Sequence, residues 1–152
     1  MSQESMVQER RAQSLDRLRS LVRTRTETLS LFSELASKRP FKPEPVVQEL
    51  LQTFCEALVD YTASAHFQLY RFIQDGSERR RDVLQAAQDV YDQIAETTGQ
   101  ILDFNDKYDC EDHCDNLSAL AEDLSRLGEV LADRINLEDR IIGALQNTAR
   151  RR

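Results

Sequence analysis

The chain contains 152 residues, of which 40% are hydrophobic and 31% are charged, with only four glycines and three prolines. This length is enough for one hydrophobic core, and so few turn residues argue against a sheet-rich protein, so we expect a single all-α domain over residues 1–152. The net charge of −7 argues against nucleic acid as a direct partner, because phosphate contacts need dense Lys and Arg, and it favours a basic protein.

The sequence also bears on location. No apolar run approaches the ~20 residues that a membrane-spanning helix needs. The first eleven residues, MSQESMVQERR, lack the apolar centre of a secretion signal. We therefore expect no membrane insertion and a cytoplasmic location. The three cysteines are then expected to be reduced thiols, with Cys55 packing in the core.

The first helix is predicted over residues 5–37, where apolar residues recur at heptad-like spacing. Arg25 stands where this pattern calls for an apolar residue. Residues 38–43 (KRPFKP) then break the helix, because each proline disfavours helix in the residue before it, and Pro43 is well placed to begin the next one. The expected core positions are Leu15, Leu18, Val22, Leu29, Phe32 and Ala36.

The second helix is predicted over residues 43–74 and carries two stripes. The first should face the core and consists of Phe54, Leu58, Tyr61, Ala65, Leu69 and Phe72. The second is turned by about one residue and mixes an acid, small residues, an aromatic ring and a base: Asp60, Ala63, Ser64, Phe67 and Arg71. This second stripe could seat a partner helix. Alternatively, Phe67 is only the margin of a wide buried face.

The third helix follows a tight connection at residues 75–77, where a glycine ends one helix and a serine can cap the next. Its apolar stripe is interrupted by Thr98 and Asn105. Residues 109–115 (DCEDHCD) should form a surface turn. The expected core positions are Val83, Ala87, Val90, Ile94, Ile101 and Leu102.

The fourth helix should begin near Asn116 and has the most regular pattern, although the acid Glu138 falls within it. Four long amphipathic helices joined by short connections favour an antiparallel up-down-up-down four-helix bundle. The expected core positions of the fourth helix are Leu117, Leu120, Leu124, Leu127, Leu131, Glu138, Ile141 and Leu145.

A buried polar layer is expected inside such a bundle. Counting from the connections places His66 and Glu138 at about the same level, so we predict that they contact each other. A buried carboxylate needs a hydrogen-bonding partner, and Arg25 and Arg134 are further candidates. We interpret His66 as a structural residue rather than as half of a catalytic acid-base pair. No phosphate-binding loop, nucleophile elbow or paired cysteine motif is present, so we expect no enzymatic activity and no catalytic residue.

Metal binding is the alternative from another class of function. Hemerythrin-like and ferritin-like bundles hold iron with several His and Glu residues on facing helices, whereas this chain has only two histidines. Four residues of types that suit zinc lie close together, namely Cys110, Asp112, His113 and Cys114. They fall within five residues, without a second ligand pair, so a surface turn is favoured. We expect no metal and no cofactor.

Three blocks, FCEALVDYTASAHFQLY, FNDKY and LEDRII, occur in this order along the chain and together resemble the Rsd/AlgQ family. The first is FCEALVDYTASAHFQLY at residues 54–70, with its serine one place later than is usual in the family. FNDKY at residues 104–108 and LEDRII at residues 137–142 follow in the family's order and at similar spacing. The resemblance begins at about residue 25. The family's N-terminal aspartate-arginine-tryptophan has no counterpart, because the chain contains no Trp.

The resemblance implies a function. Rsd/AlgQ proteins are small bacterial anti-sigma regulators that bind the primary sigma factor of RNA polymerase, mainly its region 4, which is a basic helix-turn-helix. It therefore implies a sigma factor as the partner of the second stripe on residues 43–74, with Asp60 as the charged anchor and Ala63, Ser64, Phe67 and Arg71 around it.

Overall fold

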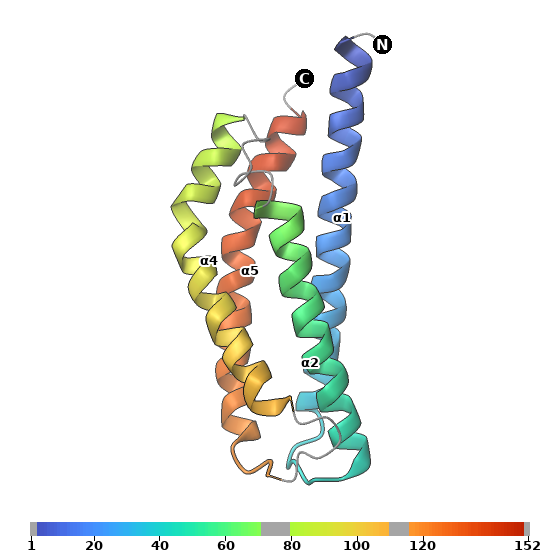
Figure 1. Cartoon of the computed structure of the whole chain (residues 1–152), viewed down its shortest axis with the longest axis vertical. Coiled ribbons are helices and arrows are strands. Elements are labelled where there is room, and N and C mark those ends of the chain that lie inside the picture. Colours follow the sequence, from blue (N-terminus) through green and yellow to red (C-terminus); the bar gives the residue numbers. More distant parts are fainter. Residues whose placement is uncertain (1–2, 71–79, 110–115, 151–152) are drawn as a thin grey trace.

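The computed structural model describes residues 3–70, 80–109 and 116–150. Within these ranges the chain is helical and contains no strand, which confirms the all-α prediction. Four long helices lie side by side, and the N-terminal part of α1 extends past the ends of the others (Figure 1). No helix of the described ranges is long and apolar enough to cross a membrane. The elements are α1 (Gln3–Ala36), α2 (Pro45–Ala65), η1 (His66–Tyr70), α4 (Arg81–Tyr108) and α5 (Leu120–Arg150).

The helix starts follow from local chemistry. α2 begins at Pro45 rather than at Pro43, after Glu44 with extended backbone angles (φ −90°, ψ 150°). Proline suits this position because the first helical N–H has no intrahelical partner to lose. α5 begins at Leu120, later than predicted. The side-chain oxygen of Asn116 accepts hydrogen bonds from the backbone N–H and the hydroxyl of Ser118, at 3.2 and 2.7 Å, and so holds a turn before the helix.

All four long helices contribute to one hydrophobic core. The rings of Phe32 and Phe54 have their centroids 5.9 Å apart, and those of Phe54 and Phe104 are 6.0 Å apart, so aromatic contacts join α1, α2 and α4. On α2 and η1 the predicted core stripe is buried from Phe54 to Leu69. Phe72 and the connection at residues 75–77 lie outside the described residues.

The predicted core faces of α1 and α4 need correction. Leu15 and Val22 are exposed, and the buried side of α1 instead carries Leu21 and Thr28. The prediction placed Arg25 correctly on this side, where only 15% of its side chain is exposed. It missed Thr28, which can be buried because its hydroxyl donates a 2.8 Å hydrogen bond to the carbonyl of Thr24.

On α4, Leu102 is exposed rather than buried, and Thr97 continues the buried stripe. Thr97 can do so because its hydroxyl donates a 2.7 Å hydrogen bond to the carbonyl of Ile94. A short polar side chain that bonds its own helix can be buried at little cost.

Gly128 marks a close approach of α5 to α1. A Cβ atom at this position would lie 2.9 Å from Cζ of Phe32, closer than carbon atoms pack in proteins. Gly143 on the same helix has nothing within 4 Å of the corresponding point. The absence of a side chain at Gly128 therefore leaves room for the Phe32 ring.

Candidate partner-binding surface

The second stripe predicted on α2 lies largely on the surface. Asp60 and Ala63 are exposed, and Phe67 is 50% exposed. Ser64 is half-buried, and its hydroxyl is buried without a hydrogen-bond partner among the described residues. Arg71 lies outside the described residues. The accessible part of this stripe is therefore Asp60, Ala63 and Phe67, which we call the α2 surface stripe.

The surface stripe crosses from α2 into the single π-helical turn η1. A π-turn contains one residue more per turn than an α-helix and occurs frequently at functional sites. In η1 the side chains of Leu69 and Tyr70 are buried, whereas His66 and Phe67 are exposed. The His66 and Phe67 rings contact each other edge to face, with centroids 5.7 Å apart. The turn thus presents two aromatic rings at the surface.

On its inner side α2 contacts a buried carboxylate, Glu138 of α5, which is completely inaccessible to solvent. The hydroxyl of Tyr61 on α2 donates to its Oε1 at 2.5 Å, and Nε of Arg134 donates to its Oε2 at 3.0 Å. Nη1 of Arg25 on α1 lies 3.5 Å from Oε1. Opposite charge and hydrogen bonds together compensate the cost of removing this carboxylate from water.

Arg134 of α5 extends the network to α4. Its Nη1 donates to the hydroxyls of Thr97 and Thr98 on α4, at 3.2 and 2.6 Å. Its guanidinium carbon lies 5.3 Å from the centre of the Tyr61 ring, in the geometry of a cation–π contact. Arg25, Tyr61, Thr97, Thr98, Arg134 and Glu138 together form what we call the buried polar layer, and it contacts all four long helices.

Three of the four residues that we expected in such a layer lie in it: Arg25, Arg134 and Glu138. The prediction for His66 is wrong, because its side chain is exposed whereas Glu138 is wholly buried. Tyr61 takes the place assigned to His66. The sequence contains a signal for this role, since a tyrosine on the buried side of a helix needs a hydrogen-bond partner for its hydroxyl. Apolar spacing alone identifies Tyr61 only as a core residue.

Burial raises the pKa of two tyrosines, Tyr61 in the layer and Tyr70 in η1. Burial, and next the charge of Glu138, raise the pKa of Tyr61 above its usual value. Burial likewise raises the pKa of Tyr70. Tyr61 therefore remains a hydrogen-bond donor at any physiological pH, which suits the support of a carboxylate rather than proton transfer.

In the described part of the chain, no group of three His, Cys, Asp or Glu side chains could hold a metal ion. The predicted cluster of Cys110, Asp112, His113 and Cys114 lies outside the described residues. The hemerythrin-like or ferritin-like alternative thus gains no ligand set from the residues that the structure describes.

In comparisons with known proteins, the matching family model and the similar proteins point to the same family. The model of the family described as "Regulator of RNA polymerase sigma(70) subunit, Rsd/AlgQ" matches residues 1–146. The chain is 37% identical over 102 residues to "Regulator of sigma D" of Enterobacter sp. (strain 638), a match that covers 66% of this chain and 61% of the relative.

The protein of the same name from Shigella dysenteriae is 34% identical over 105 residues, covering 68% of this chain and 65% of the relative. The one from Yersinia enterocolitica is 31% identical over 122 residues, covering 78% and 73%. The chain therefore spans less than two thirds of the Enterobacter and Shigella relatives. No solved structure matches the chain.

Proposed function

Because the chain belongs to the Rsd/AlgQ family, we propose that it is an anti-sigma regulator that binds the primary sigma factor and blocks its use by RNA polymerase. The observation that carries this proposal is the family match over residues 1–146, nearly the whole chain. The contact is assigned mainly to region 4 of sigma, a basic helix-turn-helix. Covering that region would keep sigma from promoter DNA and from the core enzyme.

We assign to the chain the antiparallel up-down-up-down bundle that its sequence predicts. The pattern of contacts supports this topology: α1 contacts α2, α2 contacts α4, α4 contacts α5, and α5 contacts α1. Each helix then has its sequence neighbours beside it. In such a bundle α2 has one outward side, and that side carries the α2 surface stripe.

The α2 surface stripe is the proposed sigma contact, with Asp60 as its charged anchor and Arg71 as its extension. Asp60 would pair with a basic residue of region 4, while Phe67 would bury apolar area beside that pair. The small side chain of Ala63 would allow close approach. On the inner side of α2, the bond between Tyr61 and Glu138 holds this helix in place.

The mechanism is binding alone, in the cytoplasm, without a chemical step. Charge complementarity supports this view, because residues 45–70 include three acids and no Lys or Arg. Complementary charge favours rapid and specific association with a basic surface. The buried polar layer then has a structural role, since Glu138 accepts hydrogen bonds from Tyr61 and Arg134 inside it, and Arg25 ties it to Asp139 at 2.9 Å.

The test is co-purification from a lysate of the source bacterium. The tagged chain should recover the primary sigma factor without the large subunits of core polymerase. Adding the purified chain to sigma and core should lower the amount of holoenzyme formed. Absence of sigma from the eluate, or recovery of sigma together with core, would contradict the proposal.

A further inference from the structure

Exposed apolar residues occupy adjoining flanks of α2–η1 and α4. We call six of them the α2–α4 strip: Val59, Ala63, Phe67, Tyr91, Ala95 and Leu102. Phe67, Tyr91 and Leu102 are 50%, 44% and 42% exposed, which is unusual for such large apolar side chains. On each helix the steps are multiples of a turn, so the residues share one flank. This arrangement indicates a continuous surface rather than scattered exposure.

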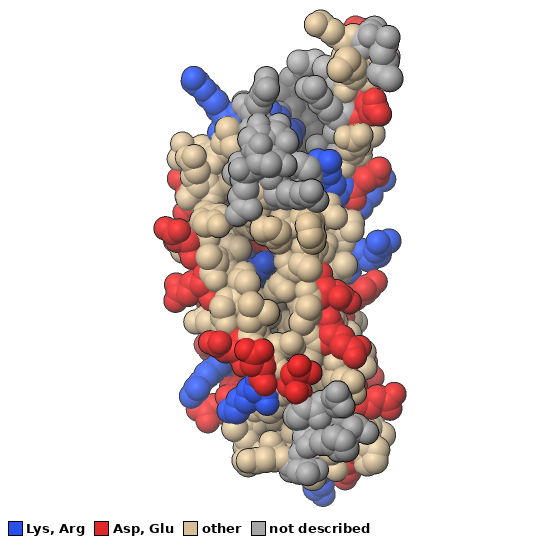
Figure 2. All heavy atoms as spheres, viewed as in Figure 1, with Lys and Arg blue, Asp and Glu red and all other residues tan. Residues whose placement is uncertain are grey.

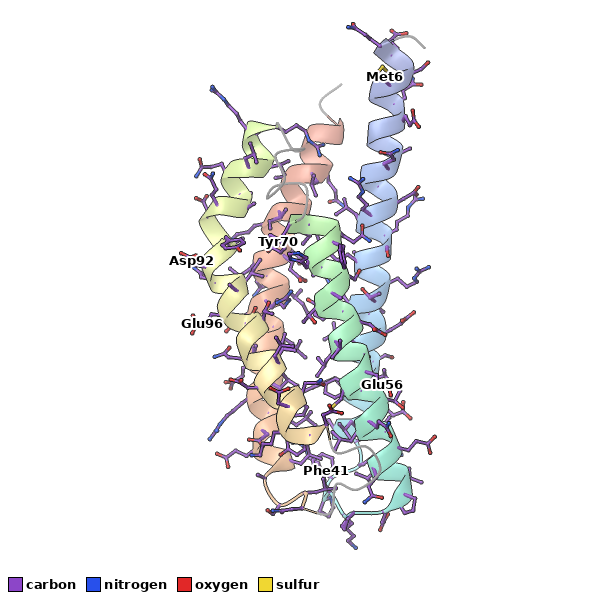
Figure 3. The ribbon with its side chains drawn as sticks, in the orientation of Figure 1. Met6, Phe41, Glu56, Tyr70, Asp92 and Glu96 are labelled. Carbon is purple, nitrogen blue, oxygen red and sulfur yellow. The ribbon has the colours of Figure 1, made fainter. Side chains whose placement is uncertain are left out.

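A ring contact between η1 and α4 holds the two flanks side by side. The ring of Tyr70 in η1 contacts the ring of Tyr91 in α4 edge to face, with centroids 5.9 Å apart. Tyr70 is buried and lies at the upper end of α2, on the side toward α4 (Figure 3). The contact identifies the flank of α4 that carries Tyr91 as the one beside η1, so the strip crosses from one helix to the other.

Acidic side chains border the strip on both sides. Across the middle of the face in Figure 2, mostly uncharged atoms lie between acids at the left and right margins, and below this level acidic and basic side chains cross the face. Asp92 and Glu96 project from the outer edge of α4, and Glu56 lies on α2 (Figure 3). The bordering acids are Glu56 and Asp60 on α2, and Asp92, Glu96 and Asp103 on α4, all exposed. The basic residues of α4, Arg81 and Lys107, stand only at its two ends.

An apolar strip between two acidic rows fits one kind of partner element. An amphipathic helix with an apolar stripe and basic residues along both edges would match the apolar area and both rows of charge. The α4 part of the strip, from Tyr91 to Leu102, is about 17 Å long, the length of about eleven helical residues. A single helix of about three turns would cover it.

We propose that the α2–α4 strip and its acidic borders bind one amphipathic, basic-edged α-helix of the partner, which lies lengthwise between α2 and α4. The inference rests on the proposed function, and it extends the contact from the α2 surface stripe to Asp92, Glu96, Tyr91 and Leu102 of α4. The partner helix belongs to another protein, and not to a second copy of this chain.

Two probes test the surface. One is the purified primary sigma factor, and the other is a synthetic amphipathic peptide of about 14 residues, four helical turns, with Leu on one face and Arg on both edges. The same peptide with Glu at the edges serves as a control. The informative variant is Asp92→Lys/Glu96→Lys. Its matched control is Glu129→Lys/Asp133→Lys, which has the same spacing and charge change at exposed positions of α5.

We expect the wild-type chain to bind sigma and the basic peptide, with weaker binding at higher salt, and to bind the acidic peptide at least about tenfold more weakly. The α4 variant should lose about tenfold or more in affinity for both ligands, whereas the α5 variant should lose far less. Leu102→Ser should weaken both complexes without changing their salt dependence. Circular dichroism and the Tm of each variant verify that it is folded.

Failure of this inference and failure of the proposed function give different results. If sigma binds and the α4 and α5 variants behave alike, the surface on α4 is excluded while the anti-sigma function stands. If sigma does not bind but the basic peptide does, and only the α4 variant weakens it, the anti-sigma function fails and the surface stands. Equal binding of both peptides overturns the inference. So does sedimentation of the wild-type chain as a dimer that Asp92→Lys/Glu96→Lys dissociates.

Discussion

The hydroxyl of Tyr61 lies 2.5 Å from a carboxylate oxygen of Glu138, and this hydrogen bond joins α2 to α5 inside the protein. Arg134 donates to the other oxygen of the same carboxylate at 3.0 Å. A carboxylate without access to water is tolerated only when such donors surround it. The stability of the protein should therefore depend on each of these donors.

Replacing Tyr61 by Phe removes the hydroxyl and keeps the ring. Glu138 then loses one donor in a place that water does not reach, so Tyr61→Phe should lower the free energy of unfolding by about 1–3 kcal/mol. Urea denaturation followed by circular dichroism measures the change. Tyr91→Phe, at an exposed ring, is the control and should change stability by less than about 0.5 kcal/mol. Equal denaturation midpoints for Tyr61→Phe and wild type would show that the hydrogen bond contributes nothing.

Replacing either Arg134 or Glu138 alone should lower the free energy of unfolding strongly. Replacing both should lower it by less than the sum of the two single losses. Arg134→Met leaves Glu138 short of its main counter-charge and should destabilise the protein by about 3–5 kcal/mol. Glu138→Leu leaves Arg134 buried and unpaired. The double variant removes both charges at once, so a double-mutant cycle should give a coupling of about 1–3 kcal/mol in favour of the pair. Strict additivity would mean that the two side chains do not act as a unit.

Substitution at the surface should affect binding and not folding. Asp60→Ala should weaken the complex with sigma by about 1–3 kcal/mol, the scale of a truncated charge pair at an interface. The Tm should stay nearly constant, because Asp60 is exposed. Isothermal titration with purified sigma gives the affinity, and Asp133→Ala on α5 is the control. Normal binding by Asp60→Ala would place the interface elsewhere, and loss of folding would show that Asp60 has a structural role.

The Cys55 thiol should be unreactive in the native protein. It is buried, and burial raises its pKa to about 12, with Asp109 and Glu56 adding to the effect. Few thiolate groups then exist at pH 8, and the thiolate is the reactive form. In a Cys110→Ser/Cys114→Ser variant, the remaining thiol should react with a thiol reagent slowly in buffer and rapidly in denaturant. Rapid reaction of the folded variant would contradict the buried position.

The raised pKa of Cys55 also predicts how the stability of the protein changes at alkaline pH. The folded-state pKa lies above that of the unfolded thiol, whose ordinary value is near 9.0. The stabilising contribution of the neutral thiol is therefore complete below about pH 9 and is lost as the pH rises toward 12. A Cys55→Ala variant should lose less stability over this range than the wild-type protein.

The two glycines of α5 should respond in opposite directions to alanine. Gly143 has open space around it, so Gly143→Ala should stabilise the protein by about 0.5–1 kcal/mol through the entropy of the unfolded chain. At Gly128 the added methyl group would meet the Phe32 ring at 2.9 Å, so Gly128→Ala should destabilise by about 1–3 kcal/mol. Thermal denaturation of both variants measures the two changes in stability. In a Phe32→Leu background, Gly128→Ala should destabilise the protein less. Equal shifts in Tm would contradict the close packing of α5 on α1.

The sequence predicted some elements better than others for identifiable reasons. Leucines at regular helical spacing predicted the buried side of α5, because its apolar pattern is nearly uninterrupted. The buried side of α1 was predicted only in part, because Thr28 lies on it with its hydroxyl bonded to the carbonyl of Thr24. Arg25 was expected on this side, but Glu138, the buried acid beside it, is more than a hundred positions away in the chain. Spacing within one helix carries no information about such a partner.

His66 shows a second limit. Counting levels along a bundle gives the height of a residue but not the direction in which its side chain points. His66 stands at the start of η1, where the helical repeat changes, and its ring is at the surface. The π-turn has no signature in the residues themselves. The blocks FCEALVDYTASAHFQLY and LEDRII nevertheless held both ends of the hydrogen bond between Tyr61 and Glu138.

The position of the buried polar layer has a consequence for the outer surface. If α2 slid along its neighbours by one turn, about 5.4 Å, Tyr61 would lose Glu138 and the buried carboxylate would lose the donor on its α2 side. Asp60 is the next residue before Tyr61, so the same slide would carry it 5.4 Å along the bundle relative to Asp92 and Glu96 on α4. The distance between acids on the two helices is thus fixed from inside. Binding of a partner helix does not change this distance. The partner is therefore recognised only if the spacing of its own basic residues already matches it.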